Sequence, residues 1–95
     1  MAEGINLVIV TPTGEAERVQ CSAVTLYARD NKKGEGGGSV GILRGHAPAV
    51  IALEESSRII CTLDGQKKVF TVDGGFASVQ NDTVTVVTPR AEKRY

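Results

Sequence analysis

The stretch GSVGILRGHAP, residues 38–48, decides the fold of this chain. Its apolar pair, Ile42-Leu43, lies between glycines and is followed at once by a glycine, a histidine and Pro48. Glycine costs conformational entropy inside a helix, and proline lacks the amide donor that a helix needs. The segment therefore predicts a short strand that ends in a tight, shaped loop.

Strand-like runs separated by turns recur on both sides of this stretch. Apolar residues alternate with other residues in the runs 5–10, 59–63 and 68–72. The last two runs are joined through Asp64-Gly65, and Asp-Gly between alternating runs is a strong signal for a hairpin turn with positive φ. Further turns are predicted at 11–14, 73–75 and 81–82. Because the strands are short and the turns frequent, the chain is predicted to be all-β, a sandwich or a barrel.

Two segments depart from this pattern. The polar, glycine-rich segment 30–38 predicts a loop, with a strand resuming at Val40. After Pro89, residues 92–94 could begin a helix. Elsewhere no ten-residue stretch shows a convincing helical period of 3.6 residues.

Length and charge limit the possible functions. The chain has 95 residues, which corresponds to one domain spanning 1–95 with a core at about 5–90. Eleven basic residues balance eleven acidic ones, which argues against a nucleic-acid binder and against a polybasic membrane anchor. No run approaches the roughly 20 apolar residues of a membrane helix, and the N-terminus lacks a signal-type core. We expect a chain that is neither inserted in a membrane nor exported.

The two cysteines, Cys21 and Cys61, both lie in strand-like apolar contexts. The favoured interpretation is a pair of small buried hydrophobic residues, which is how free cysteines usually behave. A disulfide is the alternative, and it is uncommon in cytosolic chains. A zinc site is less favoured, because the chain has no close pair of ligands.

The candidate chemical motifs point to no catalysis. Residues 36–41 match G-x-G-x-x-G in form, but no helix can follow them to receive a pyrophosphate, so no cofactor is expected. His46, the single histidine, would need a partner such as Asp73 or Ser78 to act as a general base. The favoured interpretation is a loop histidine that shapes a contact surface. We therefore assign no catalytic, cofactor-binding or metal-binding residue.

Two features are consistent with a protein partner. Basic residues gather around the glycine-rich loop and form either a solvated rim or a contact for an acidic partner: Arg29, Lys32, Lys33 and Arg44. The alternating strands also carry apolar residues on the face opposite their main apolar set, namely Val8, Val10 and Ile60. They form either an exposed interface or a face that the second sheet covers.

The order of these segments resembles the N-terminal β-sandwich of the epsilon subunit of F-type ATP synthases, called delta in mitochondria. That family carries a segment like Gly-x-Leu-Gly-Ile-Leu-x-Gly-His-Ala-Pro, which residues 38–48 resemble. Residues 72–80, VDGGFASVQ, and the closing strand 84–87 resemble its later segment, and residues 7–12 its first strand. The resemblance covers roughly residues 5–90.

The resemblance implies a two-sheet β-sandwich of about ten short strands, with no C-terminal helical hairpin within these residues. It implies a rotor subunit of the central stalk of a proton- or sodium-translocating synthase. This subunit couples gamma to the c-ring of the membrane rotor and performs no chemistry of its own. It further implies peripheral membrane association through the complex only. The complex would lie on the cytoplasmic face of a bacterial plasma membrane, or on an organelle inner or thylakoid membrane.

By the same resemblance, Thr11 and His46 are candidates for the gamma-facing side, and Ser39, at the tip of the preceding loop, for the ring-facing end. Arg44 is a further candidate partner contact. Two other hypotheses remain: a free-standing β-sandwich that binds a different protein, and a small hydrolase that uses His46. Phe70 and Phe76 are predicted to be core or interface anchors.

Overall fold

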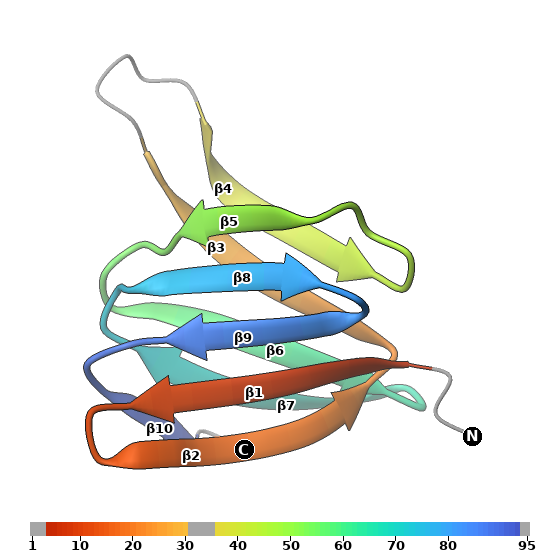
Figure 1. The fold of residues 1–95 in the computed structure, drawn as a ribbon, viewed down its shortest axis with the longest axis horizontal. Helices are drawn as coiled ribbons and strands as arrows, with labels where there is room; N and C mark the ends of the chain where they lie inside the picture. Colours follow the sequence, from red (N-terminus) through yellow and green to blue (C-terminus); the bar gives the residue numbers. More distant parts are fainter. Residues whose placement is uncertain (1–3, 31–35, 94–95) are drawn as a thin grey trace.

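Two five-stranded sheets stack face to face in the computed structural model, which describes residues 4–30 and 36–93 (Figure 1). The described residues form ten strands and no helix. The predicted all-β sandwich of about ten strands is therefore confirmed. In chain order the strands are β1 Ile5–Thr11, β2 Gly14–Cys21, β3 Ala23–Asp30, β4 Gly36–Leu43, β5 Ala49–Ala52, β6 Ser57–Leu63, β7 Gln66–Val72, β8 Phe76–Gln80, β9 Thr83–Val87 and β10 Ala91–Lys93.

The two sheets mix strands that are distant in the chain. We call the sheet with the order β2-β1-β9-β8-β5 sheet A, and the sheet with the order β10-β7-β6-β3-β4 sheet B. Neighbouring strands are antiparallel except for β1 and β9, which pair in parallel in the middle of sheet A. This parallel pair joins the first strand of the chain to the ninth within sheet A, while the last described strand, β10, lies in sheet B.

The core lies between the inner faces of the two sheets. Alternation along each strand sends one set of side chains inward. In the alternating run 5–10, Ile5, Leu7 and Ile9 have no exposed surface. Phe70 is also fully buried and is a core anchor, as predicted. The buried cluster contains Ile5, Leu7, Ile9, Cys21, Val24, Leu26, Ile42, Leu53, Ile59, Cys61, Phe70, Val72, Ala77, Val79, Val84 and Val86.

The tight turns form where the sequence predicts them. Asp64 and Gly65 have φ of 52° and 78°, and Asn81 and Asp82 have φ of 52° and 56°. Two central residues with positive φ match the twist of paired strands, and Asn, Asp and Gly tolerate that conformation best. Both turns therefore set the register of their hairpins, β6–β7 and β8–β9.

Two local predictions are wrong. Strand β4 begins at Gly36 rather than at residue 40. The reason is that β3 extends to Asp30, and its backbone pairs with the start of β4. Residues 31–35 of the predicted loop lie outside the described residues. Residues 91–93 form strand β10 rather than the start of a helix. The edge of β7 offers them a backbone partner, and a helix of so few residues has no comparable source of stability.

The favoured interpretation of the cysteines is also wrong, because Cys21 and Cys61 form a disulfide. Cys21 ends β2 of sheet A and Cys61 lies in β6 of sheet B, and both are buried. Their Cα atoms are 5.7 Å apart, within the usual range for a disulfide. The pairing follows from the stacking of the two sheets, which places residues 40 positions apart opposite each other.

Candidate protein-interaction surface

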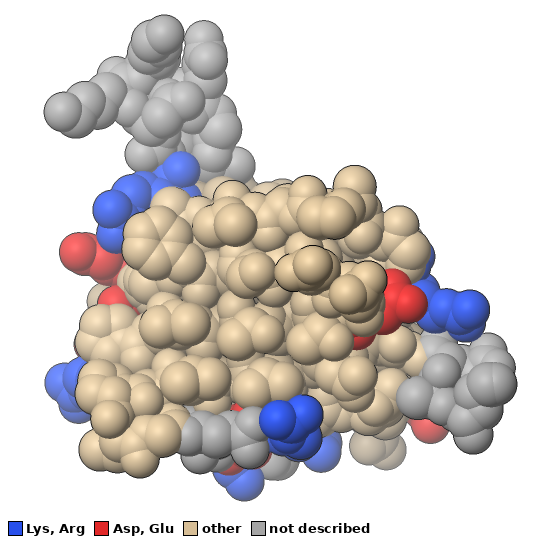
Figure 2. All heavy atoms as spheres, viewed as in Figure 1, with Lys and Arg blue, Asp and Glu red and all other residues tan. Residues whose placement is uncertain are grey.

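The outer face of sheet A lacks charge over most of its width. Its four adjacent strands β1, β9, β8 and β5 contain no lysine, arginine, aspartate or glutamate, although the chain has eleven basic and eleven acidic residues. Figure 2 shows the same face as an uncharged expanse with charged side chains at its rim. The polar residues of this face, such as Ser78, Gln80 and Thr85, are therefore all uncharged.

Large apolar side chains project from this face. Val50, Phe76 and Val87 are 73%, 58% and 54% exposed. Phe76 pairs directly with Val87 on one side and with Ala52 on the other, and Val87 pairs with Val10. We call Val10, Val50, Ala52, Phe76 and Val87 the apolar face. It crosses four strands without interruption, and contiguous exposed apolar surface of this kind marks interaction sites.

A glycine at the entrance to β8 holds this cluster together. Gly75 has φ of 102°, and a Cβ at this position would collide with the carbonyl of Val87. The Gly75 carbonyl accepts a hydrogen bond from the Leu53 amide at 2.9 Å, which ties the turn to the end of β5. The turn thus places Phe76 beside Val87 while Ala77 points into the core.

The outer face of sheet B is different in character. Arg58 and Lys67 are exposed there, and the Arg58 guanidinium lies 5.7 Å from the centroid of the Tyr27 ring. Such charged side chains keep a sheet face solvated. The apolar face is therefore a property of sheet A.

The predicted gamma-facing residues do not lie together. Thr11 ends β1, where its hydroxyl donates to the Gly14 carbonyl at 3.2 Å in the β1–β2 turn. His46 lies in the β4–β5 loop, which is held to the β8–β9 turn by the Gly45 amide donating to Asp82 Oδ1 at 2.7 Å. Because β1 and β9 run in parallel, these two turns lie at opposite ends of sheet A.

His46 itself has a local role in the structure. Its Nδ1 lies 2.7 Å from the Ala47 carbonyl, and since a carbonyl can only accept, Nδ1 carries the proton. The proposed partners lie elsewhere: Asp73 follows β7 in sheet B, and Ser78 is in the middle of β8. Within the described residues no hydrogen bond joins either of them to His46, so the structure offers the hydrolase hypothesis no support.

The remaining predicted contacts are placed as follows. Arg44 is exposed in the β4–β5 loop, next to Gly45. Ser39 is exposed but lies within β4, opposite Tyr27, so the prediction that it sits at a loop tip is wrong. Of the predicted basic cluster, Lys32 and Lys33 lie outside the described residues.

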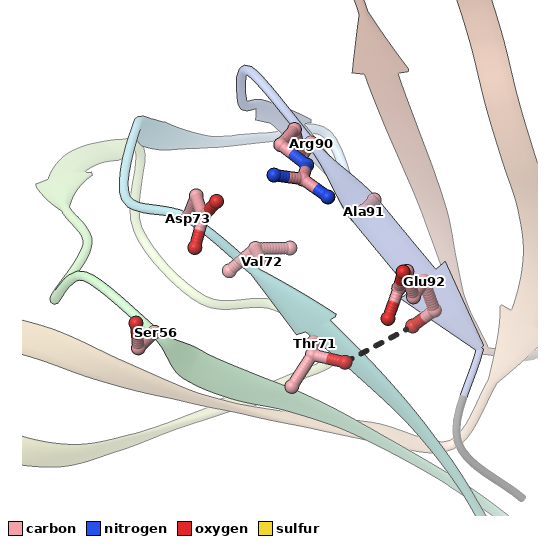
Figure 3. A pocket seen from close by; sticks show the side chains of 7 residues that line it. All are labelled: Ser56, Thr71, Val72, Asp73, Arg90, Ala91 and Glu92. Carbon is pink, nitrogen blue, oxygen red and sulfur yellow. Dashed lines mark hydrogen bonds between the residues drawn. The ribbon is translucent and has the colours of Figure 1, made fainter.

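A cavity of about 310 Å³ lies against the paired strands β7 and β10 and the residues beside their ends (Figure 3). Its walls mix one guanidinium with two carboxylates, and the Thr71 hydroxyl donates to the Glu92 carbonyl at 3.5 Å. The lining residues are Ser56, Thr71, Val72, Asp73, Arg90, Ala91 and Glu92. Across residues 4–30 and 36–93, no three histidine, cysteine or acidic side chains are grouped to hold a metal ion. The cavity shows no dominant ligand chemistry.

Sequence reasoning only partly found the apolar face. It singled out Phe76 as an anchor, and Val8 and Val10 for their position on a second face, but it missed Val50 and Val87. Val8 is in fact buried at 7% exposure, and Ile60 is half-buried on sheet B. One signal in the sequence could have pointed to this face, because residues 49–53 and 74–81 contain no charged residue. That these two segments form one surface follows only from the pairing of β5, β8 and β9.

Residues 4–30 and 36–93 contain no helix that is long and apolar enough to cross a bilayer.

The chain matches known proteins along nearly its whole length. Residues 4–94 match the family model of the ATP synthase delta/epsilon chain β-sandwich domain. The ATP synthase epsilon chain of Paracoccus denitrificans is 30% identical over 94 residues, covering 99% of this chain and 59% of the relative. That of Bacillus subtilis is 33% identical over 88 residues, covering 93% of this chain and 61% of the relative. The chain thus spans about three fifths of the length of these relatives.

Solved structures give the same result. A chain in the structure of the Euglena gracilis mitochondrial ATP synthase (OSCP/F1/c-ring, rotational state 1) superposes with a TM-score of 0.75 at 25% identity. The match covers 95% of this chain and 53% of that one. A chain in the central stalk/c-ring structure of the Tetrahymena thermophila mitochondrial ATP synthase, 16% identical with a TM-score of 0.65, shares the fold. The family model and these relatives show that this chain belongs to the ATP synthase delta/epsilon chain β-sandwich family.

Proposed function

We propose that the chain is the β-sandwich part of a rotor subunit in the central stalk of an F-type ATP synthase. In this role it binds the gamma subunit and the c-ring, couples their rotation and performs no chemistry. The observation that carries the proposal is the apolar face, together with family membership. A rigid sandwich transmits torque when large interfaces hold it, and it needs no catalytic residues.

The apolar face is the proposed docking surface for gamma. Aromatic side chains that are buried on binding contribute most to protein interfaces, and Phe76 is the aromatic residue of this face. Thr11 and His46 lie at the two ends of the same sheet. A partner that covers the face from end to end would contact both residues. It would also contact Arg44, which lies close to His46 in the β4–β5 loop.

The proposed contact with the c-ring lies on another part of the molecule. Strands β3 and β4 extend beyond the margin of sheet A as a projecting hairpin, visible at the top of Figure 1. Ser39 lies on this hairpin. Contact between the hairpin and the ring would place the chain at the membrane surface as a peripheral member of the complex, on the side where the synthase head lies.

The test is complex formation with the gamma subunit of the same synthase, measured by size-exclusion chromatography with mass detection. The wild-type chain is expected to form a one-to-one complex. Phe76→Glu should raise the Kd by about tenfold or more, because a carboxylate would be buried in an apolar contact. The matched control is Leu63→Glu, at a residue that is 40% exposed at the end of β6 in sheet B, and it should bind like the wild type.

The thermal midpoint of both variants should remain near that of the wild type, since both side chains are exposed. If folded wild-type chain and folded gamma do not associate, the stalk function is wrong, and a free-standing module with another partner is favoured. If the complex forms and Phe76→Glu binds as tightly as the control, the docking surface is wrong.

A further inference from the structure

Strand pairing arranges the outward side chains of sheet A in three rows that run across β1, β9, β8 and β5. The first row is apolar and lies at the end of the sheet where β1 reaches Thr11. The second is mixed, and the third is polar and lies next to the β8–β9 turn. The first row is Val10, Val87, Phe76 and Ala52, the second is Val8, Thr85, Ser78 and Val50, and the third is Asn6, Thr83 and Gln80.

The polar side chains of the second and third rows carry no charge. Ser78 and Gln80 are exposed. A sheet face that stays in water can carry charged side chains at such positions, as sheet B does with Arg58 and Lys67. A face that is buried in a protein contact cannot do so at low cost, and the centres of interfaces are accordingly depleted of charged residues. The polar rows therefore have the composition of an interface centre, and the charges lie at the rim (Figure 2).

Ser78 and Gln80 also have free hydrogen-bonding capacity. Within the described residues, their side chains form no hydrogen bond, so water is their partner in the free chain. Thr83 differs, because its hydroxyl donates to the Asn81 carbonyl at 3.4 Å. A partner that covers Ser78 and Gln80 removes this water, and a polar group left unpaired in a contact costs about 1–3 kcal/mol. Such a partner must therefore offer hydrogen-bonding groups at this end of the face.

We propose that Ser78 and Gln80 determine the orientation in which gamma binds sheet A. Gamma places apolar side chains on the first row and uncharged hydrogen-bonding groups on Ser78 and Gln80. The reverse orientation would set polar groups of gamma against Phe76 and leave Gln80 unpaired, which selects against it. The inference rests on the proposed function, which identifies the partner as gamma. It adds the chemistry of the gamma surface and the direction in which that surface lies.

Matched glutamine variants test the role of the polar end. Gln80→Ala should raise the Kd for gamma about five- to tenfold, because a hydrogen-bonding group of gamma loses its partner. Gln66→Ala is the control, since Gln66 is also exposed and begins β7 in sheet B. It should bind like the wild type. Both variants should keep the wild-type Tm, and Ser78→Ala is measured beside them as the second member of the polar pair.

Calorimetry at several temperatures separates the two ends of the face. Burial of apolar surface gives a negative heat-capacity change of binding. Phe76→Ala should make this change less negative, because it removes apolar surface from the contact. Gln80→Ala should weaken binding and leave the heat-capacity change close to that of the wild type. A purely structural role for Gln80 would instead lower the Tm of the free chain.

Photo-crosslinking measures the orientation directly. A benzophenone side chain is introduced at position 87 in one sample and at position 80 in another, and mass spectrometry identifies the gamma residues that are captured. Position 87 should capture gamma residues among apolar neighbours. Position 80 should capture a different site on gamma whose neighbours are polar and uncharged.

The outcomes separate the inference from the proposed function. Weaker binding of Gln80→Ala than of Gln66→Ala, with capture of the two expected gamma sites, supports the orientation. If Phe76→Glu weakens the complex while Gln80→Ala and Ser78→Ala bind like the wild type, the inference is wrong and the proposed function stands. Capture of charged or apolar gamma residues from position 80 also overturns it. The absence of any complex overturns both, and capture of a second copy of this chain would show that the face has another occupant.

Discussion

At the scale of single residues, the apolar face depends on Gly75. Its φ of 102° lies in the region that favours glycine, and its Cα approaches the Val87 carbonyl too closely for any side chain. Gly41 shows the opposite situation, because its φ is not positive and a Cβ there would meet no atom within 4 Å. The backbone conformation and packing therefore require glycine at position 75 but not at position 41.

Gly75→Ala is expected to destabilise the chain by about 2–4 kcal/mol, the sum of the strained conformation and the collision with Val87. Gly41→Ala, the control, should be neutral or stabilise the chain by up to about 1 kcal/mol, because alanine restricts the unfolded chain. Urea unfolding measures both. Equal free energies of unfolding for the two variants would show that Gly75 has no conformational role.

Residue-level predictions succeeded where a local pattern carries the information. The inward set Ile5, Leu7 and Ile9 and the turn Asp64-Gly65 follow from alternation and from φ preferences that act within a few residues. The role of Phe76 could not be decided in this way. Its exposure depends on whether another layer covers sheet A, and the run FASVQ does not contain that information.

At the scale of elements, the disulfide is the strongest link between the edge of sheet A and sheet B. Cys21 joins β2 to Cys61 in β6. Lys93 Nζ and Glu17 Oε2 are 3.5 Å apart, with Lys93 exposed and Glu17 partly exposed, so solvent screens the pair and it contributes about 0–1 kcal/mol. The attachment of β2 therefore depends mainly on the disulfide and on its hydrogen bonds to β1.

Reduction of the disulfide should lower the free energy of unfolding by about 2–4 kcal/mol, because closing a loop of 40 residues restricts the unfolded chain. Guanidinium unfolding with and without a phosphine reductant measures the loss. The double variant Cys21→Ala/Cys61→Ala should be insensitive to the reductant. If the wild type is equally insensitive, while free-thiol titration shows that its cysteines are reduced, the disulfide does not stabilise the sandwich.

The element boundaries show where the sequence was insufficient. Strand β4 starts at Gly36, although three successive glycines favour a loop, because the extended β3 supplies a backbone partner. Strand β10 forms for the same reason along β7. In both cases pairing with a distant strand outweighs local preference, which is generally weaker for strands than for helices.

At the scale of the whole molecule, the chain has the dimensions of one domain. Its Cα radius of gyration is 12.4 Å, and a compact domain of 95 residues is expected to have about 12 Å. The buried cluster draws residues from both sheets and from both ends of the described chain. The parallel pair β1–β9 and the disulfide join parts of the chain that are distant in sequence.

The chain should therefore unfold in a single cooperative transition, with an unfolding enthalpy at the midpoint of about 65 kcal/mol for its length. Differential scanning calorimetry of the oxidised chain measures this value. Agreement between the calorimetric and van't Hoff enthalpies would support the prediction that residues 1–95 form one domain. Two resolved transitions would contradict it.

The sequence by itself determined the fold class, the positions of most turns and the inner face of the strands. It also determined the family, through the segments 38–48 and 72–80. These properties follow from alternation, from φ preferences and from an ordered pair of motifs, all of which are local. Only the tertiary structure decided the pairing of Cys21 with Cys61, the separation of Thr11 from His46 and the assembly of the apolar face. Each of these depends on which distant strands become neighbours, and strand pairing between distant residues is a property of the folded chain as a whole.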